Sequence, residues 1–147
     1  MGTIGAMVSL AGLGAGPAAA EITGEGIAGV HVGMDEATVV DRLGHPSATT
    51  GREGPDTKRL DYRRHKLDVL LHRGQVIRVR TTSSGQRTPG GVGPGTSQRA
   101  MLRKLRGERC GTAQGARVCW VLDGATVLSF TCRRGRVTVA EVARAEQ

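Results

Sequence analysis

Aromatic side chains are almost absent from this sequence. Its 147 residues contain one Trp, one Tyr and one Phe, which are Trp120, Tyr62 and Phe130. Because so few rings are available, the core must consist of Val, Leu, Ile, Met and Ala, and we expect Trp120 and Phe130 to be needed inside it. The scarcity also argues against single-stranded nucleic acid as a ligand, since bases are commonly held by stacking on exposed aromatic rings.

Catalytic and metal-binding patterns are also missing. The four histidines, His31, His45, His65 and His72, have no metal-ligand or triad spacing, so we expect surface or loop positions for them. No Cys-x-x-Cys pair occurs, and the cysteines and scattered histidines do not form a zinc pattern. Residues 90–95 are rich in Gly, but no Lys follows them as a phosphate-binding loop requires. The sequence therefore predicts no catalytic residue, no metal site and no cofactor, and a protein that is not an enzyme.

Charge is missing from the first part of the chain. Residues 1–20 have no charged side chain, include an apolar Gly-rich run and end in Ala18, Ala19 and Ala20. This pattern is typical of a secretory signal peptide cleaved near Ala20, although no Lys or Arg precedes the apolar run. The run is too short for a permanent membrane span, and no Cys follows it to carry a lipid anchor. We therefore expect a secreted bacterial protein with no stable membrane anchor.

Three cysteines are present, and in an oxidising compartment two of them are expected to form a disulfide. Cys110–Cys119 is the preferred pair, because Gly111 and Gly115 between them bend freely. Cys132 would then be buried and free. The alternative pair, Cys119–Cys132, would link neighbouring strands.

A weak internal repeat organises the rest of the sequence. Residues 29–36 recur as residues 91–98, and each copy continues into a short amphipathic helix. Asp35 and Ser97 suit the helix starts, and Gly44 and Gly107 suit the helix ends. The apolar helix positions are Val39, Val40 and Leu43 in the first copy and Met101, Leu102 and Leu105 in the second.

Three strand-like runs follow each helix. They are residues 60–64, 67–72 and 76–81 in the first copy and 118–122, 126–133 and 137–142 in the second. Arg73-Gly74 and Arg134-Gly135 predict hairpin turns between the last two runs of each copy. We therefore predict an α+β fold in which residues 21–85 and 86–147 are two tandem α-β-β-β repeats. Their strands form one continuous antiparallel sheet with both helices on one face, and the other face is open to water or a partner.

The run from Val32 to Gly44, followed by a three-stranded meander and a repeat of both, resembles the β-lactamase-inhibitor-protein-like (BLIP-like) superfamily. Small outer-membrane assembly lipoproteins of the SmpA/OmlA type share its single-repeat unit. The resemblance covers about residues 27–145 and implies the fold, export and binding to other proteins. Two features depart from it: the inhibitor's binding sheet is rich in aromatics, and the lipoproteins have a lipidated N-terminal Cys. No functional residue is therefore carried over.

Positive charge is concentrated in the second repeat. Residues 21–85 have ten basic and nine acidic side chains, whereas residues 86–147 have eleven and four. Such an excess favours an acidic partner or a polyanion. The candidate basic patch consists of Arg103, Lys104, Arg106, Arg109, Arg133, Arg134 and Arg136.

Two functions follow from these patterns. The first is a secreted, non-enzymatic module that binds a partner protein, with inhibition of that partner as one form of this function. The second is binding of a cell-wall polymer or nucleic acid through the basic second repeat.

Overall fold

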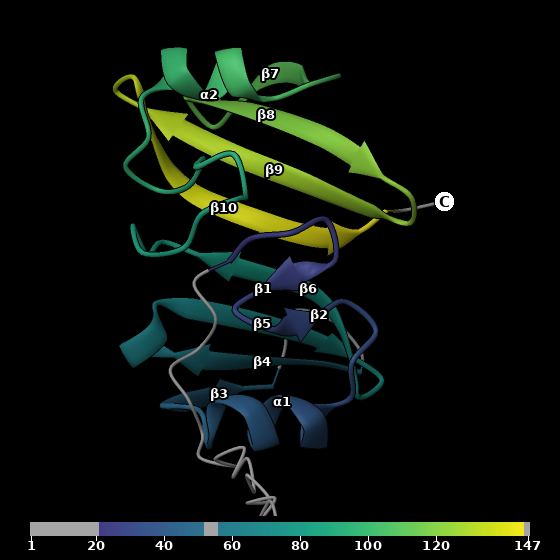
Figure 1. Ribbon diagram of the computed structural model, residues 1–147. Helices are drawn as coiled ribbons and strands as arrows, with labels where there is room; N and C mark the ends of the chain where they lie inside the picture. The colour runs from purple at the N-terminus through teal and green to yellow at the C-terminus, as the bar shows by residue number, and fades with distance from the viewer. Residues whose placement is uncertain (1–20, 52–55, 146–147) are drawn as a thin grey trace, which may run out of the picture.

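The structure, a computed structural model, is built on one eight-stranded sheet and describes residues 21–51 and 56–145. The expected signal peptide lies outside these residues. The strand order is β3-β4-β5-β6-β10-β9-β8-β7, and every neighbouring pair is antiparallel (Figure 1). The strands are β3 (Ala48–Thr50), β4 (Thr57–Tyr62), β5 (Leu67–His72), β6 (Gln75–Thr81), β7 (Arg109–Ala113), β8 (Ala116–Asp123), β9 (Thr126–Arg133) and β10 (Arg136–Arg144). The fold is therefore α+β with a continuous antiparallel sheet.

The helices are short and begin at the predicted caps. α1 (Glu36–Leu43) starts after Asp35, whose carboxylate accepts hydrogen bonds from the Thr38 hydroxyl and the Thr38 backbone N–H. These two bonds lower the pKa of Asp35. α2 (Gln98–Lys104) starts after Ser97, whose hydroxyl accepts from the Ala100 N–H. Both caps are thus confirmed.

Helix ends match the prediction less well. α1 ends at Gly44 as predicted, with φ 82°. α2 ends earlier than predicted, because Leu105 is already extended (φ −75°, ψ 143°) and Gly107 lies beyond it. Leu105 packs against the core from this extended position, so tertiary contact ends the helix before the glycine.

Two edge strands were not predicted. β3 and β7 consist of mostly exposed small and polar residues, so neither has the alternating apolar pattern of a half-buried strand. The prediction of a strand over residues 60–64 was also partly wrong. Strand β4 ends at Tyr62, and Arg63–His65 form a short 3₁₀ helix, η1. Each half of the sheet therefore has four strands instead of three.

The two predicted hairpin turns are confirmed. Arg73 and Gly74 have φ of 50° and 78°, and Arg134 and Gly135 have φ of 52° and 77°. Positive φ at both central residues is the geometry that matches the twist of paired strands. Both hairpins also contain a register shift close to the turn, at Leu70/Leu71 in one and Val137/Val139 in the other. The two hairpins are therefore alike in turn and in bulge.

The halves of the sheet meet where β6 pairs with β10. Arg80 stands directly opposite Glu141, and the pairs on either side are Thr81–Ala140 and Val79–Val142. The Arg80 guanidinium donates to the Glu141 carboxylate at 3.0 Å, and Arg78 Nε lies 3.4 Å from the same carboxylate oxygen. Opposite charges therefore face each other at the seam.

The core lies on one face of this sheet. Cross-strand neighbours share a face, and the row Leu60, Val69, Val79 and Val142 is fully or almost fully buried. Val39 of α1 and Met101 of α2 are both 0% exposed and belong to the same cluster. One aliphatic interior therefore spans both halves, and each fully buried Val or Leu contributes about 1.5–3 kcal/mol to it.

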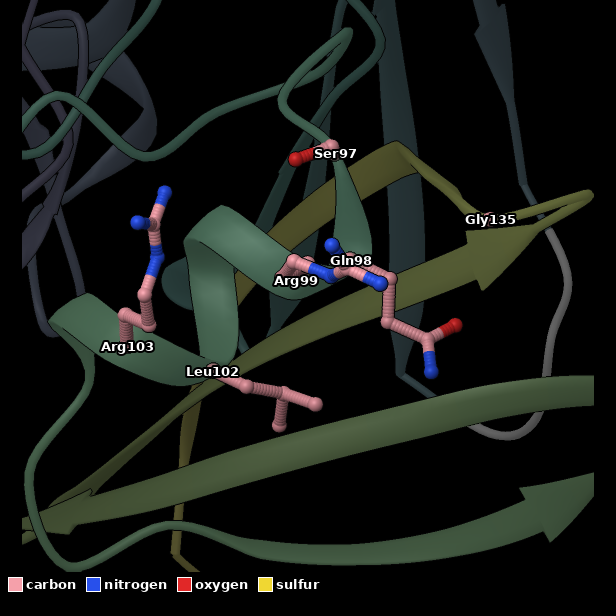
Figure 2. A pocket seen from close by; sticks show the side chains of 6 residues that line it. All are labelled: Ser97, Gln98, Arg99, Leu102, Arg103 and Gly135. Atoms are coloured by element: carbon pink, nitrogen blue, oxygen red, sulfur yellow. The ribbon is translucent and has the colours of Figure 1, made fainter.

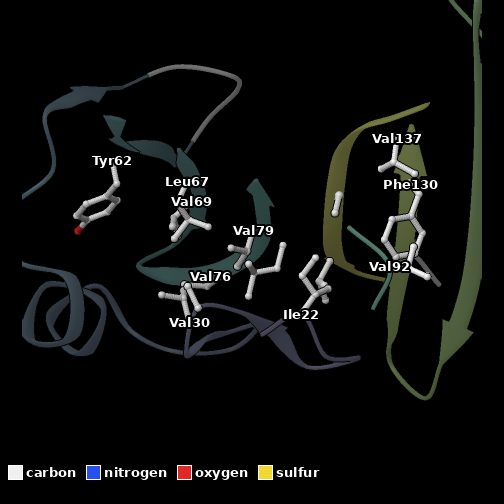
Figure 3. Packing of buried hydrophobic residues seen from close by; sticks show 14 of the residues in the cluster. Ile22, Val30, Tyr62, Leu67, Val69, Val76, Val79, Val92, Phe130 and Val137 are labelled. Carbon is white, nitrogen blue, oxygen red and sulfur yellow. The ribbon is translucent and has the colours of Figure 1, made fainter. Parts of the chain in front are cut away.

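An N-terminal arm covers the middle of this face. Ile22 donates its N–H to the Arg87 carbonyl at 2.8 Å, and residues 26–31 form the small ribbon β1 (Gly26–Ile27) and β2 (Val30–His31). Figure 3 shows Val30 and Ile22 pointing toward the strand residues, with Val92 beside Phe130. Ile22, Ile27 and Val30 are 0% exposed, so the arm closes the core between the two helices.

We predict that Glu141→Arg lowers the free energy of unfolding by about 1 kcal/mol, because it places like charges opposite each other on paired strands. Chemical denaturation measures this value. The control is the exchange Arg80→Glu/Glu141→Arg, which restores opposite charges and should recover part of the loss. If the double variant is no more stable than Glu141→Arg, the seam does not depend on this pairing.

Candidate binding surfaces

The sheet face opposite the helices has no covering element within residues 21–51 and 56–145. Trp120 belongs to this open face, because cross-strand partners share a face of the sheet. The row of partners that starts at Trp120 continues through Ser129 and Glu141 to Arg80. The prediction that Trp120 lies inside the core was therefore wrong, whereas Phe130 is 0% exposed as predicted. Cys119 and Trp120 are adjacent in β8, so only one of them can face the core, and the disulfide partner Cys119 does.

Apolar side chains gather around Trp120. Leu122, two residues along β8 on the same face, is 68% exposed, and it stands opposite Val127 of β9. The Trp120 ring lies across Gly111 of β7, since a methyl group built on that glycine would be 3.5 Å from the ring. A half-buried indole beside an exposed leucine therefore marks the β7–β9 part of the open face.

The other half of the open face is charged. Arg59 of β4 donates to the Asp68 carboxylate of β5 at 2.8 Å and pairs with its second oxygen at 2.7 Å. On the same face, Arg78 and Arg80 of β6 form ion pairs with Glu141 of β10. The open face therefore has a charged band across β4, β5, β6 and β10 beside the apolar surface around Trp120.

Two hollows interrupt this face, one on each side of Arg80 and Val139. One, of about 330 Å³, is lined by Arg80, Val139 and residues of β8, β9 and the β7–β8 turn, among them Ser129, Thr131 and Arg133. The other, of about 300 Å³, is lined by Arg80, Val139 and residues of β4 and β5. Arg80 and Val139 therefore form a ridge between two depressions that are large enough to receive side chains.

On the helix side, the predicted disulfide is present. Cys110 of β7 and Cys119 of β8 are direct cross-strand neighbours and are bonded. Cys132 is free and buried, with its Sγ 3.8 Å from the Met101 Sδ. Burial raises the pKa of the Cys132 thiol, and the nearby Arg117 guanidinium opposes that shift. Cys132 is therefore held as a neutral thiol.

The structure places the residues of the predicted basic patch in three separate positions. Arg103 and Lys104 lie in the last turn of α2, and Arg106 follows it. Arg133 and Arg136 are cross-strand partners beside the Arg134 turn, and the Gly135 carbonyl of that turn accepts from the first N–H of α2. The two groups therefore lie toward opposite ends of α2, roughly 10 Å apart along its axis. Arg109 is opposite Trp120 and so belongs to the open face.

A groove runs along α2. It has a volume of about 570 Å³ and is lined by Ser97, Gln98, Arg99, Leu102, Arg103 and Gly135. Figure 2 shows Gln98 and Leu102 extending from the same side of the helix over the strands. We call this feature the α2 groove. It combines an apolar residue with exposed arginines on the covered side of the sheet.

Two histidines that are distant in sequence meet at a smaller hollow. His45 and His65 line a space of about 210 Å³ with Ser47, Tyr62 and Arg64. The Ser47 hydroxyl accepts from the Arg63 N–H at 3.2 Å, and the Tyr62 hydroxyl donates to the Gly44 carbonyl at 2.9 Å. The hydrogen bonds described for Ser47 and Tyr62 therefore anchor this loop to the strand and do not form a nucleophile–base pair.

Within residues 21–51 and 56–145, no cluster of His, Cys, Asp and Glu is arranged to hold a metal ion. Over the same ranges, no helix has the length and apolar character needed to cross a bilayer.

Comparisons with known proteins identify a shared fold. No protein-family model and no curated protein matches the chain. Among solved structures, it is similar to an extracellular protein containing an SCP domain from Bacillus anthracis (TM-score 0.59, 9% identity, 77% of this chain and 44% of that one). It is also similar to a DUF4309 family protein (YjgB) of Bacillus subtilis (0.56, 13%, 80% and 83%). A third is the uncharacterized protein yfeY of Escherichia coli (0.55, 14%, 85% and 99%).

The chain therefore spans less than half of the SCP-domain protein but nearly all of yfeY. At these identities the likeness concerns the fold alone. None of the three is described as BLIP-like, so that resemblance stays a prediction.

We predict that Cys110→Ser/Cys119→Ser lowers the free energy of unfolding by about 2–3 kcal/mol, because the bond restrains the unfolded chain over a sequence separation of nine residues. Urea denaturation in the presence and absence of a thiol reductant measures the effect. Reductant should destabilise the native protein and leave the double variant unchanged. An equal response of both proteins would contradict the bond.

Proposed function

We propose that this chain is a secreted, non-enzymatic module that binds a protein through the open face of its sheet. The observation that supports it is the position of Trp120 and Leu122, which form an apolar surface on a face that no described element covers. In a chain with a single Trp, burial of that ring in the core would be the favoured use of it. Its position outside therefore supports a role in binding.

The composition of the face is that of a protein interface. Aromatic and Arg residues dominate binding energy at such surfaces, usually in a centre that is protected from water by neighbouring contacts. Here Trp120 and Leu122 supply the apolar part, and Arg80 stands on the ridge between the two hollows. A partner that places an apolar side chain on Trp120 and fills the hollows would be complementary to this face.

The wider architecture supports the same proposal. We propose that residues 21–85 and 86–147 are tandem repeats, since each half has a capped helix, a similar hairpin and the same contact between helix start and hairpin turn. In the first half Gly33 donates to the Val76 carbonyl at 2.7 Å, and in the second Gly95 donates to the Val137 carbonyl at 2.7 Å. Duplication of a unit with one covered face produces a wide sheet with one open face.

Secretion is part of the proposal. A cross-strand disulfide and the likeness to an extracellular protein are compatible with it, and the signal peptide over residues 1–20 is its sequence basis. The protein would then meet its partner outside the cytoplasm.

We predict that a partner shields Trp120. As the single Trp in the chain, Trp120 gives a fluorescence signal that comes from this face alone, and iodide should quench it in the free protein. Crosslinking in the native culture fluid, read by mass spectrometry, should recover a protein with the unaltered chain and much less of it with Leu122→Ser. Addition of that protein should reduce quenching of Trp120.

The matched control is Val40→Ser, which removes a comparable apolar side chain from α1 on the covered side. Circular dichroism of both variants establishes that they fold. Equal recovery of the same protein by Leu122→Ser and Val40→Ser, or unchanged quenching on binding, would reject the open face as the interface.

A further inference from the structure

The two halves differ in how their helices contact the sheet. In the first half, the Glu36 carboxylate of α1 forms an ion pair with Lys58 of β4 at 2.5 Å. Lys58 is opposite Leu71 and therefore points to the same side as α1. This pair connects the first turn of α1 to strand β4.

The corresponding positions of the second half cannot form that pair. Gln98 occupies the place of Glu36, because each donates its N–H to a hairpin glycine, Gly135 at 2.8 Å and Gly74 at 3.2 Å respectively. Arg117 occupies the place of Lys58. In the first half, Lys58 is the cross-strand partner of Leu71, which pairs with Val76, the first valine after the hairpin turn. In the second half, Arg117 is the cross-strand partner of Cys132, which pairs with Val137, again the first valine after the turn. The carboxylate of the first half is therefore replaced by a neutral amide.

The α2 groove lies at Gln98, the position that corresponds to Glu36, and its charged residues are arginines. Arg99 and Arg103 line the groove and are exposed. Arg117 is also exposed and is on the same side of the sheet, opposite Cys132, whose Sγ contacts Met101 of α2. Among residues 21–51 and 56–145, no carboxylate lies within ion-pair distance of these three arginines. Leu102 contributes an apolar contact beside the row that Arg99 and Arg103 form at positions i and i+4, on the side of the helix from which Gln98 extends (Figure 2).

We propose that the α2 groove is a second docking site, which binds an acidic peptide segment of a partner protein. Its carboxylates pair with Arg99 and Arg103 and are attracted by Arg117 on the same side of the sheet, and an apolar side chain of the segment packs on Leu102. A guanidinium group matches the planar geometry of a carboxylate through two parallel hydrogen bonds. Volumes of roughly 300–1,000 Å³ are typical of sites for small ligands and side chains, and the groove falls in this range.

The shape and composition favour a peptide over other anionic partners. A membrane-binding surface needs large apolar side chains that project into the lipid, whereas Leu102 is partly buried and packs against the core. A single-stranded nucleic acid would need an aromatic ring for stacking, and none of the groove residues is aromatic. A row of two arginines beside an apolar residue instead matches a chain in which acidic and apolar residues alternate.

The test uses a fluorescently labelled synthetic peptide in which Leu alternates with Glu, and a neutral version in which Gln replaces Glu. We expect the purified protein to bind the acidic peptide in an anisotropy titration and to bind the neutral one far more weakly. Arg99→Gln/Arg103→Gln should weaken binding about tenfold, since exposed ion pairs contribute up to about 1 kcal/mol each. Leu102→Ser should weaken it further, whereas an electrostatic site alone would not respond to Leu102.

The matched control is Arg106→Gln/Arg144→Gln, which removes the same charge from the second half outside the groove and should leave binding nearly unchanged. Equal loss in both double variants would overturn the proposal in favour of general charge attraction. Binding of heparin or of phosphatidylglycerol vesicles with no binding of the peptide would also overturn it. Because Leu122→Ser leaves the α2 groove intact, peptide binding in that variant separates this site from the open face.

Discussion

The pairing of β6 with β10 is the contact on which the rest of the structure depends. It joins two four-stranded halves into a single sheet and brings Val79 beside Val142 in the middle of the buried face. Without this seam the second half would have one short helix, and the first half one short helix and the N-terminal arm, to cover its strands. A chain with three aromatic residues has few large side chains to compensate. Burial of many aliphatic residues in one shared interior therefore replaces the aromatic packing that other small domains use.

The two halves combine similar helix starts and hairpins with different, partly exposed side chains. The helix starts, hairpin turns and bulges correspond, because they are needed to place a helix on a twisted sheet. The side chains at partly exposed positions do not correspond between the halves. Where β4 has Arg59 and Asp61, the aligned positions of β8 have Val118 and Trp120, and where α1 has Glu36, α2 has Gln98. The differences between the halves are thus concentrated at partly exposed positions.

Local signals in the sequence were reliable where the interaction is itself local. The caps at Asp35 and Ser97 act on residues three positions later, and the two Arg-Gly turns act within their own hairpins. The Cys110–Cys119 bond also connects nearby residues across one tight turn. Predictions failed where distant residues decide. Edge strands β3 and β7 bury little, α2 ends when Leu105 meets the core, and Trp120 faces outward because Cys119 faces inward.

The sequence by itself therefore determined the α+β class, the helix starts, the hairpins and the disulfide, since each depends on residues close together in the chain. Tertiary structure decided which face stays open, how the N-terminal arm completes the core, and that Arg117 faces the same side of the sheet as α2, opposite Cys132. The physical reason is that a strand has two faces, and only its pairing with remote strands fixes which one is buried. Both proposed binding sites are formed in this way, by residues that the chain brings together from separate strands and helices.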